Sequence, residues 1–267
     1  KYSDNQIEGL DTIIKLRLNK YCKGCKYFNV FNIEHIANLP DKYYIIEELP
    51  KLKDNFEKNE VAGACVADII KAGVLPVAME FMDRLCIETS ENFANAGYPD
   101  AEALLIVEVE GSEPEIQEQL EKIIAIAEKH NPIELRESKS EEESAKIWLG
   151  RKSAFGAIGQ ISDYMCLDGT IPVSELPYVL KRIGEIGNEY GLKVGNVFHA
   201  GDGNMHPLIL FDANKPGDLE LCEQMGAEIL RLCVEVGGCL TGEHGVGVEK
   251  RDLMFDQYSD QDIEAQL

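Results

Sequence analysis

The chain has 267 residues, of which 45% are hydrophobic and 28% are charged, a composition typical of a globular protein with a sizeable core. Its formal net charge of −22 at pH 7 would repel a phosphate backbone, which excludes nucleic acid as an expected partner. No apolar run approaches the roughly 18–20 residues of a transmembrane segment, and the polar start KYSDNQIEGL does not resemble a secretory signal. Because its eight scattered cysteines are typical of reduced thiols, we expect a cytoplasmic protein.

The first part of the chain, residues 1–57, is an unassigned segment that is rich in Lys and Asn and only weakly periodic. Two stretches in it, Ile13–Leu18 and Lys42–Leu49, have the pattern of β-strands. Cys22 and Cys25 form a lone CxxC motif. A redox or zinc role would require a second pair at a comparable spacing, so we interpret this motif as a chance occurrence.

The remainder, residues 58–267, alternates between helical and strand patterns and forms the second domain. The expected helices are 61–74, 83–97, 112–130, 140–160, 174–191 and 218–236, and the expected strands are 76–81, 102–111, 132–138, 192–200 and 205–212. Strand 102–111 is expected to carry its acidic residues on an outer face. With one clear hairpin near residue 200, this order predicts an α+β fold, in which an antiparallel sheet has helices packed on one face.

The hairpin is the stretch FHAGDGNMHP, which places His199 and His206 on either side of a glycine-rich turn. If Gly201–Asn204 is the loop, the two histidines are directly opposed, with Cβ atoms roughly 4.5–5.5 Å apart on one face. Two adjacent imidazoles can chelate a divalent ion. Taken alone, the hairpin is equally compatible with a surface turn that happens to contain two histidines.

A second stretch, GGCLTGEHGVGVEK, places Glu243 and His244 side by side between glycines. Glu243 would complete a His₂Glu ligand set with an open coordination position, which a catalytic metal requires. Neighbouring side chains in extended backbone point in opposite directions, so His244 would be free for another task. The alternatives are a phosphate-binding glycine loop, which lacks the usual Lys-Ser/Thr pair, and a zinc hydrolase, which lacks HExxH.

Together these two motifs resemble the C-terminal, substrate-binding domain of the FAD-linked 2-hydroxyacid oxidases and dehydrogenases, of the glycolate oxidase and D-lactate dehydrogenase type. The stretches AMEFMDRL, AGYPDAEALLIVEVEG, IWLGRKSAFGAIG and DGTIPVSELP agree with this resemblance, which runs from about residue 58 to the end. It implies a ferredoxin-like domain and the oxidation of a small 2-hydroxyacid, glycolate or D-lactate, to the 2-keto acid with FAD. The family's flavin domain and its closing segment are not found in the chain, so we expect part of a longer protein, truncated at the C-terminus of this domain.

The resemblance also implies roles for individual residues. His199, His206 and Glu243 match the ligands of a divalent metal (zinc, manganese or iron), His244 matches the general base, and Arg151 matches the residue that holds the substrate carboxylate. An alternative for Arg151 is a surface ion pair. The implied partners are the missing FAD-binding domain or subunit and an electron-transfer subunit, and such partner subunits would hold the protein peripherally at the inner membrane.

Two positions depart from the family pattern, and several polar residues receive a structural interpretation. Val173 stands where an arginine is common, and Leu208 stands where some relatives have an asparagine that touches substrate. Further conspicuous residues are interpreted as helix caps (Glu80, Asp83), as solvated (Lys250) or as belonging to no motif (His35, His130). The competing function, from another class, is a metal-binding or assembly module that catalyses nothing.

Overall fold

The structure is a computed structural model that describes residues 42–47 and 55–266. The expected strand Ile13–Leu18, the Cys22–Cys25 motif and His35 lie outside the described residues. The expected strand at 42–49 is confirmed as β1, Lys42–Glu47.

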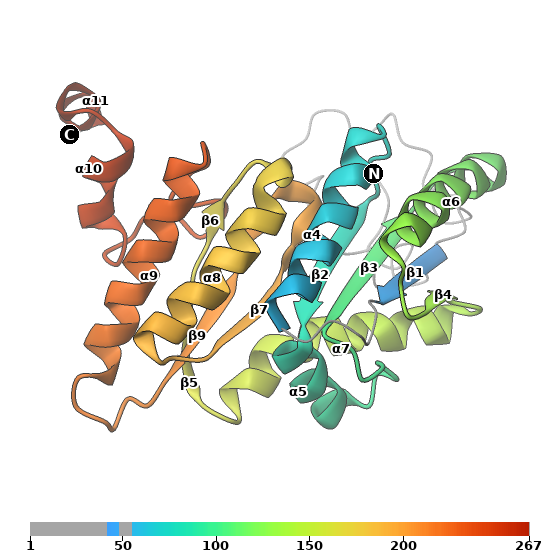
Figure 1. Cartoon of the computed structure of the whole chain (residues 1–267), viewed down its shortest axis with the longest axis horizontal. Helices are drawn as coiled ribbons and strands as arrows, with labels where there is room; N and C mark the ends of the chain where they lie inside the picture. Colours follow the sequence, from blue (N-terminus) through green and yellow to red (C-terminus); the bar gives the residue numbers. More distant parts are fainter. Residues whose placement is uncertain (1–41, 48–54, 267) are drawn as a thin grey trace, which may run out of the picture.

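The described chain forms one sheet of nine strands, and every strand pair in it is antiparallel (Figure 1). The strands are β1 (Lys42–Glu47), β2 (Ala78–Asp83), β3 (Ala103–Val109), β4 (Leu135–Glu137), β5 (Asp163–Cys166), β6 (Gly169–Thr170), β7 (Val194–His199), β8 (Asn204–Met205) and β9 (Pro207–Phe211). Their order is β4-β1-β3-β2-β7-β8-β6, and β9 pairs with β5 and β7. The central strands β2 and β7 are therefore far apart in sequence and adjacent in space.

Six longer helices cover the two faces of this sheet (Figure 1). They are α4 (Asn55–Lys71), α5 (Arg84–Ala94), α6 (Glu113–Ala127), α7 (Glu141–Gly159), α8 (Leu176–Tyr190) and α9 (Asp218–Glu235), followed by the short α10 (Met254–Gln257) and α11 (Asp260–Gln266). Residues of α4, α6, α8 and α9 form the larger hydrophobic core with one face of the sheet. Residues of α5 and α7 form a second core on the opposite face.

The α+β class with an antiparallel sheet is confirmed, but helices pack on both faces and not on one only. This changes the environment of β3, where Leu104 and Ile106 join the second core while Leu105 and Val107 join the first. The expectation of an acidic outer face on this strand is wrong: Glu108 is only 4% exposed, and by the alternation of side chains it lies on the same face as Leu104 and Ile106.

Capping residues that can be recognised in the sequence set several helix boundaries. Ser112 and Glu115 form a capping box at the start of α6, with the Ser112 N–H donating to the Glu115 carboxylate at 2.8 Å. Asp83 caps α5 by accepting from the Cys86 N–H at 3.1 Å, as expected. Gly191 ends α8 in the left-handed conformation (φ +68°), which glycine adopts without steric cost.

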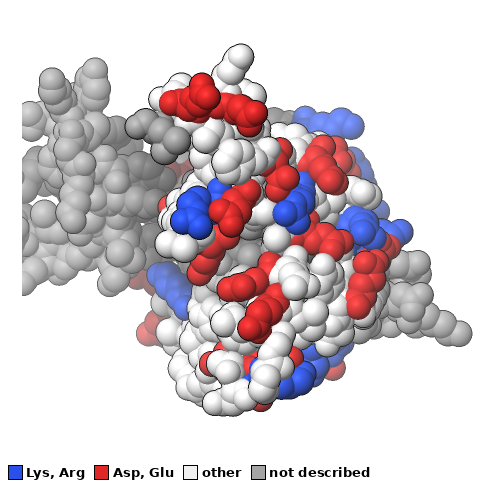
Figure 2. Space-filling view, turned by 90° about the vertical axis from the view of Figure 1, so that its left-hand side faces the viewer, with Lys and Arg blue, Asp and Glu red and all other residues white. Residues whose placement is uncertain are grey.

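The surface carries intermixed charge. Figure 2 views the side of the molecule where α9, α10 and α11 lie, and it shows acidic side chains spread over this face with basic ones between them. Such a face has no continuous positive field that would attract a polyanion. Among the helices within residues 55–266, none is both long enough and apolar enough to cross a bilayer.

Candidate active site

The histidine hairpin exists, but its register differs from the expected one. The strand pairing places His199 opposite Asn204 and Asn196 opposite Pro207, so the loop is residues 200–203 and His199 is not paired with His206. His206 lies two residues after Asn204, the residue opposite His199. Because side chains alternate with a period of two, a two-residue offset keeps both imidazoles on the same face. Their ring centroids are 5.5 Å apart.

Gly203 explains why the loop closes one residue early. Residues Ala200–Asp202 form a single 3₁₀ turn, and Gly203 follows in the left-handed region with φ +67°. An added Cβ at Gly203 would lie 2.1 Å from the Ile171 carbonyl oxygen, so only glycine fits here. The Gly203 carbonyl in turn accepts from the Ile171 N–H at 2.9 Å, which ties the hairpin to the chain after β6.

The second motif folds around the buried carboxylate of Asp168, which is 0% exposed. This carboxylate accepts from the N–H groups of Gly242, Glu243 and His244 at 3.0, 3.1 and 2.8 Å. It also accepts from the Thr241 hydroxyl at 2.7 Å. Burial would raise the pKa of Asp168, but these bonds together hold that pKa well below its ordinary value.

This arrangement rules out the phosphate-loop interpretation of residues 241–245. The N–H groups that would cradle a phosphate already donate to Asp168, and the Gly245 N–H donates to the Thr241 hydroxyl at 2.9 Å. The loop is also not extended, so Glu243 and His244 do not point in opposite directions. Both side chains reach the same histidine cluster: the Glu243 Oε1 atom is 3.9 Å from His244 Nε2.

Four side chains converge near the turn of the hairpin: His199, His206, Glu243 and His244. Glu243 Oε1 lies 3.4 Å from His206 Nε2 and 3.9 Å from His199 Nε2. The ring centroids of His206 and His244 are 4.9 Å apart. One ligand atom from each of His199, His206 and Glu243 falls within 4.8 Å of the others, so the expected ligand set is brought together.

His206 is the buried member of the cluster and His199 is more open. The His206 Nε2 atom is buried and has no hydrogen-bond partner, and the side chain is 4% exposed against 40% for His199. Burial and the neighbouring His199 and His244 lower the pKa of His206 to about 4. A neutral imidazole with an unpaired inward nitrogen is what a metal ion requires of a histidine. The donor set therefore fits a divalent metal.

Asp168, His206 and His244 form a second grouping of possible ligand atoms. The donors to Asp168 are unevenly distributed: Oδ2 accepts from the Thr241 hydroxyl, from the N–H groups of residues 242–244 and from Lys250 Nζ at 3.3 Å, whereas among the described residues Oδ1 accepts only from the Glu243 N–H. Oδ1 therefore keeps capacity for a ligand and lies 3.8 Å from His206 Nε2, but Asp168 is completely buried. The His199–His206–Glu243 set has the freer carboxylate, since the Glu243 side chain is 50% exposed.

Arg151 reaches the cluster indirectly. Its guanidinium donates through Nε and Nη2 to Glu80 Oε2, at 3.0 and 2.7 Å, and Glu80 Oε1 lies 2.8 Å from His199 Nδ1. Burial alone would raise the pKa of Glu80, but His199 and Arg151 together hold it below its ordinary value. The alternative of a surface ion pair is wrong, because Arg151 is only 6% exposed.

Two residues that the sequence interpretation set aside belong to this region. Glu80 does not cap α5, whose N-cap is Asp83; it lies on β2 with 4% exposure, and its side chain binds Arg151 of α7. Lys250 is not solvated, since it is 5% exposed and faces Asp168. An acidic residue inside the apolar strand AMEFMD was the available signal for Glu80. His130 lies elsewhere, 3.0 Å from Asp68, and contributes nothing to the cluster.

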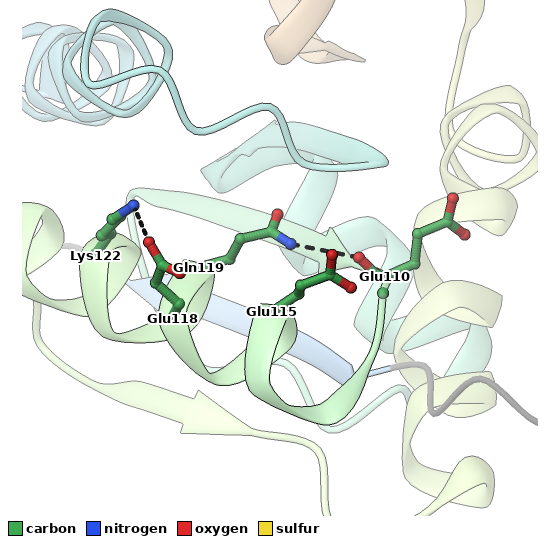
Figure 3. A pocket seen from close by; sticks show the side chains of 6 residues that line it. Glu110, Glu115, Glu118, Gln119 and Lys122 are labelled. Carbon is green, nitrogen blue, oxygen red and sulfur yellow. Dashed lines mark hydrogen bonds and ion pairs between the residues drawn. The ribbon is translucent and has the colours of Figure 1, made fainter.

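A surface groove of about 420 Å³ lies at the start of α6, away from the histidines (Figure 3). It is lined by Glu110, Gly111, Glu115, Glu118, Gln119 and Lys122, none of which belongs to the cluster. Its polar groups bind one another: Lys122 contacts Glu118 at 2.6 Å, and Gln119 donates to the Glu110 carbonyl at 3.3 Å (Figure 3). The groove is therefore part of the solvated surface of α6.

Comparison with known proteins identifies the fold that carries this site. Residues 55–266 match the family described as FAD linked oxidases, C-terminal domain. The chain belongs to this family. As a FAD-linked oxidase C-terminal domain it is 50% identical over 211 residues to the glycolate oxidase subunit GlcD of Escherichia coli K12, a match that covers 78% of the chain and 42% of that protein. The same subunit of Bacillus subtilis 168 is 34% identical over 212 residues, which cover 79% of the chain and 45% of that protein.

More distant relatives of this FAD-linked oxidase domain include the mitochondrial D-lactate dehydrogenase [cytochrome] of Kluyveromyces lactis, which is 26% identical over 76% of the chain and 36% of that protein. Among solved structures, 4-ethylphenol oxidase from Gulosibacter chungangensis shares the fold at a TM-score of 0.58 and 12% identity, over 91% of the chain and 57% of that protein. The chain thus spans less than half the length of the curated relatives that it matches.

Proposed function

We propose that the chain is the substrate- and metal-binding part of a FAD-dependent oxidoreductase that oxidises glycolate or D-lactate to the 2-keto acid. The observation that carries the proposal is the convergence of His199, His206 and Glu243, one ligand atom of each lying within 4.8 Å of the others. The relatives named glycolate oxidase subunit and D-lactate dehydrogenase support the substrate class.

The metal would be held by the two Nε2 atoms of His199 and His206 and by the Glu243 carboxylate. Two imidazoles and one carboxylate suit zinc, manganese or iron, because these ions accept nitrogen together with oxygen ligands. When bound, such an ion supplies Lewis acidity at the substrate hydroxyl and carboxylate oxygens. The orphaned Nε2 of His206 supports this assignment, since a buried polar atom without a partner is rare in native proteins.

His244 is proposed as the general base. Its ring lies beside His206, and its side chain is 44% exposed, so it can meet a substrate that enters from the open side. An imidazole can remove the hydroxyl proton near neutral pH. Oxidation then requires loss of the C2 hydrogen with its electron pair, for which FAD, bound by a domain or subunit outside the described residues, supplies the acceptor.

Arg151 is proposed to hold the substrate carboxylate. Glu80 engages its Nε and Nη2 atoms, and a guanidinium has five N–H groups, so donors remain for a second carboxylate. The planar fork of Arg gives two parallel hydrogen bonds that Lys cannot reproduce. An electron-transfer subunit is the further partner that we propose, because GlcD is named as a subunit.

The proposal is tested in a protein that joins this chain to its FAD-binding domain. Glycolate and D-lactate should each be assayed for flavin reduction in an anaerobic stopped-flow experiment. We expect His199→Ala and His206→Ala to lose metal, measured by elemental analysis, with partial recovery of flavin reduction at excess divalent ion. His130→Ala is the control, because it removes a histidine outside the cluster, and it should behave as wild type.

His244→Ala should retain the metal and slow substrate oxidation by roughly 10²–10⁴-fold, the usual contribution of a general base. Arg151→Lys should mainly raise KM, because a point charge replaces a two-pronged contact. If His244→Ala releases the metal while Glu243→Gln keeps it, the two roles are exchanged. If neither hydroxyacid reduces the flavin while the metal is present, the chain is a metal-binding module and the enzymatic proposal is wrong.

A further inference from the structure

Glu80 is a buried acid in the middle of the sheet, and the proposed reaction gives it no task. It lies on β2 directly opposite His199 on β7, with a side chain that is 5% exposed. Its two oxygens have different partners: Oε1 faces His199 Nδ1 at 2.8 Å, and Oε2 accepts from Arg151 at 2.7 and 3.0 Å. One carboxylate thus connects a strand histidine to a helix arginine.

The contact with Glu80 fixes where His199 carries its proton. An ionised carboxylate only accepts hydrogen bonds, so the imidazole must present Nδ1–H to it. The lone pair of the neutral ring is then on Nε2, the atom that lies 3.9 Å from Glu243. Arg151 supplies the cation that a buried carboxylate needs, because its guanidinium donates to Oε2 through both Nε and Nη2.

We propose that Glu80, held by Arg151, is a positioning residue that sets the tautomer and orientation of His199 for metal binding. The inference rests on the proposed function, since it concerns the same metal. It gives Arg151 a second role, at the metal end of the site, beside its proposed contact with substrate. A mutation of Arg151 should therefore affect metal affinity as well as KM.

The two imidazoles differ in their support. His206 Nδ1 faces the Cys166 thiol at 4.0 Å, a weak interaction, whereas His199 has a carboxylate at hydrogen-bond distance. His206 is also packed on all sides with 3% exposure, so its ring is held by burial. His199 is much more exposed and depends on Glu80 for its orientation. We therefore expect the effect of Glu80 to act through His199 alone.

The test measures metal binding by the purified chain. Zn²⁺ and Mn²⁺ are titrated into metal-free wild type, Glu80→Gln, His199→Ala and Asp83→Asn by competition calorimetry. Glu80→Gln should weaken binding by about 10–100-fold, the usual cost of losing the residue that orients a metal-binding histidine. Asp83→Asn is the matched control: it neutralises another buried carboxylate of β2, whose partners are Cys86 and Asn196, and should leave the affinity unchanged.

A second readout is the tautomer of His199 in the metal-free chain, observed by long-range ¹H–¹⁵N spectra at alkaline pH. Wild type should show the Nδ1–H form, and Glu80→Gln should lose this preference because an amide can donate as well as accept. Arg151→Lys keeps the charge but not the two N–H contacts, so it should weaken metal binding less than Glu80→Gln. Should Glu80→Gln not fold, Glu80→Asp, which withdraws the carboxylate by one methylene, takes its place with the same expectations.

The outcomes separate the two proposals. If wild type binds no metal, the proposed function is overturned, and the tautomer experiment still decides whether Glu80 sets His199. If wild type binds metal and Glu80→Gln binds it equally well with an unchanged tautomer, the positioning role is overturned while the metal site stands. A loss of affinity in Asp83→Asn equal to that in Glu80→Gln would also overturn the positioning role, because the effect would then be general.

Discussion

Replacing Asp168 with Asn tests whether one carboxylate holds the Glu243–His244 loop. The change removes the negative charge and puts an NH₂ group where one oxygen now accepts hydrogen bonds. Lys250, 5% exposed, loses its charged partner, and breaking a buried pair in this way costs about 3–5 kcal/mol. Hydrogen bonds to a charged acceptor contribute about 1.5–3 kcal/mol each, but these contributions overlap, so we expect a total loss of about 4 kcal/mol.

Urea unfolding followed by far-UV circular dichroism measures this loss in the metal-free chain. Asp256→Asn is the control: Asp256 pairs with Arg231 at 2.9 Å, and because the two side chains are 40% and 49% exposed, the change should cost under about 1 kcal/mol. In Asp168→Asn the backbone amides of Gly242 and His244 should also exchange hydrogen faster. A stability within about 1 kcal/mol of wild type, together with unchanged amide exchange, would refute this account of the loop.

Three further predictions concern separate features of the fold. With metal removed, the free energy of unfolding of wild type relative to His206→Asn should fall by up to about 3 kcal/mol between pH 6.5 and pH 4, because the pKa of His206 is lowered to about 4 and the unfolded chain binds the proton first. The difference is the quantity to measure, because burial raises the pKa of Asp83 to about 6 and this stabilises the folded chain as the pH falls over the same range; equal slopes in the two proteins would contradict the prediction. Gly238→Ala should lower the free energy of unfolding, measured by thermal denaturation, by more than about 2 kcal/mol, because the added Cβ would lie 1.8 Å from a carbonyl oxygen. Gly245→Ala should lower it by only about 1–2 kcal/mol, because the added Cβ meets open space and only the backbone conformation (φ +86°) is unfavourable. Among the six described cysteines, the exposed Cys239 should be alkylated first. Cys166 should react slowly, because burial raises the pKa of its thiol to about 12. If mass spectrometry of partly labelled protein shows the reverse order, this prediction is wrong.

Local patterns accounted for most of the secondary structure and for the membership of the cluster. Caps such as Ser112 and Asp83 act over three residues, so the sequence shows them directly. The hairpin prediction had the wrong register but kept both histidines on one face, because an offset of two preserves the alternation of side chains. The second layer of helices was missed, since an amphipathic pattern shows that a helix has a buried face but not which side of the sheet it covers.

The sequence by itself determined which side chains make up the cluster: two histidines flanking a turn, and a glutamate next to a third histidine between glycines. Only the tertiary structure decided what those side chains can do. The contact between Glu80 and His199 spans 119 positions, and that between Asp168 and His244 spans 76. Such contacts depend on how strands pair and how α7 packs, which no local pattern encodes. Burial then acts on the groups that packing brings together. A buried carboxylate needs a cation beside it, and Glu80 has Arg151 while Asp168 has Lys250. Burial also lowers the pKa of His206, which favours its neutral form.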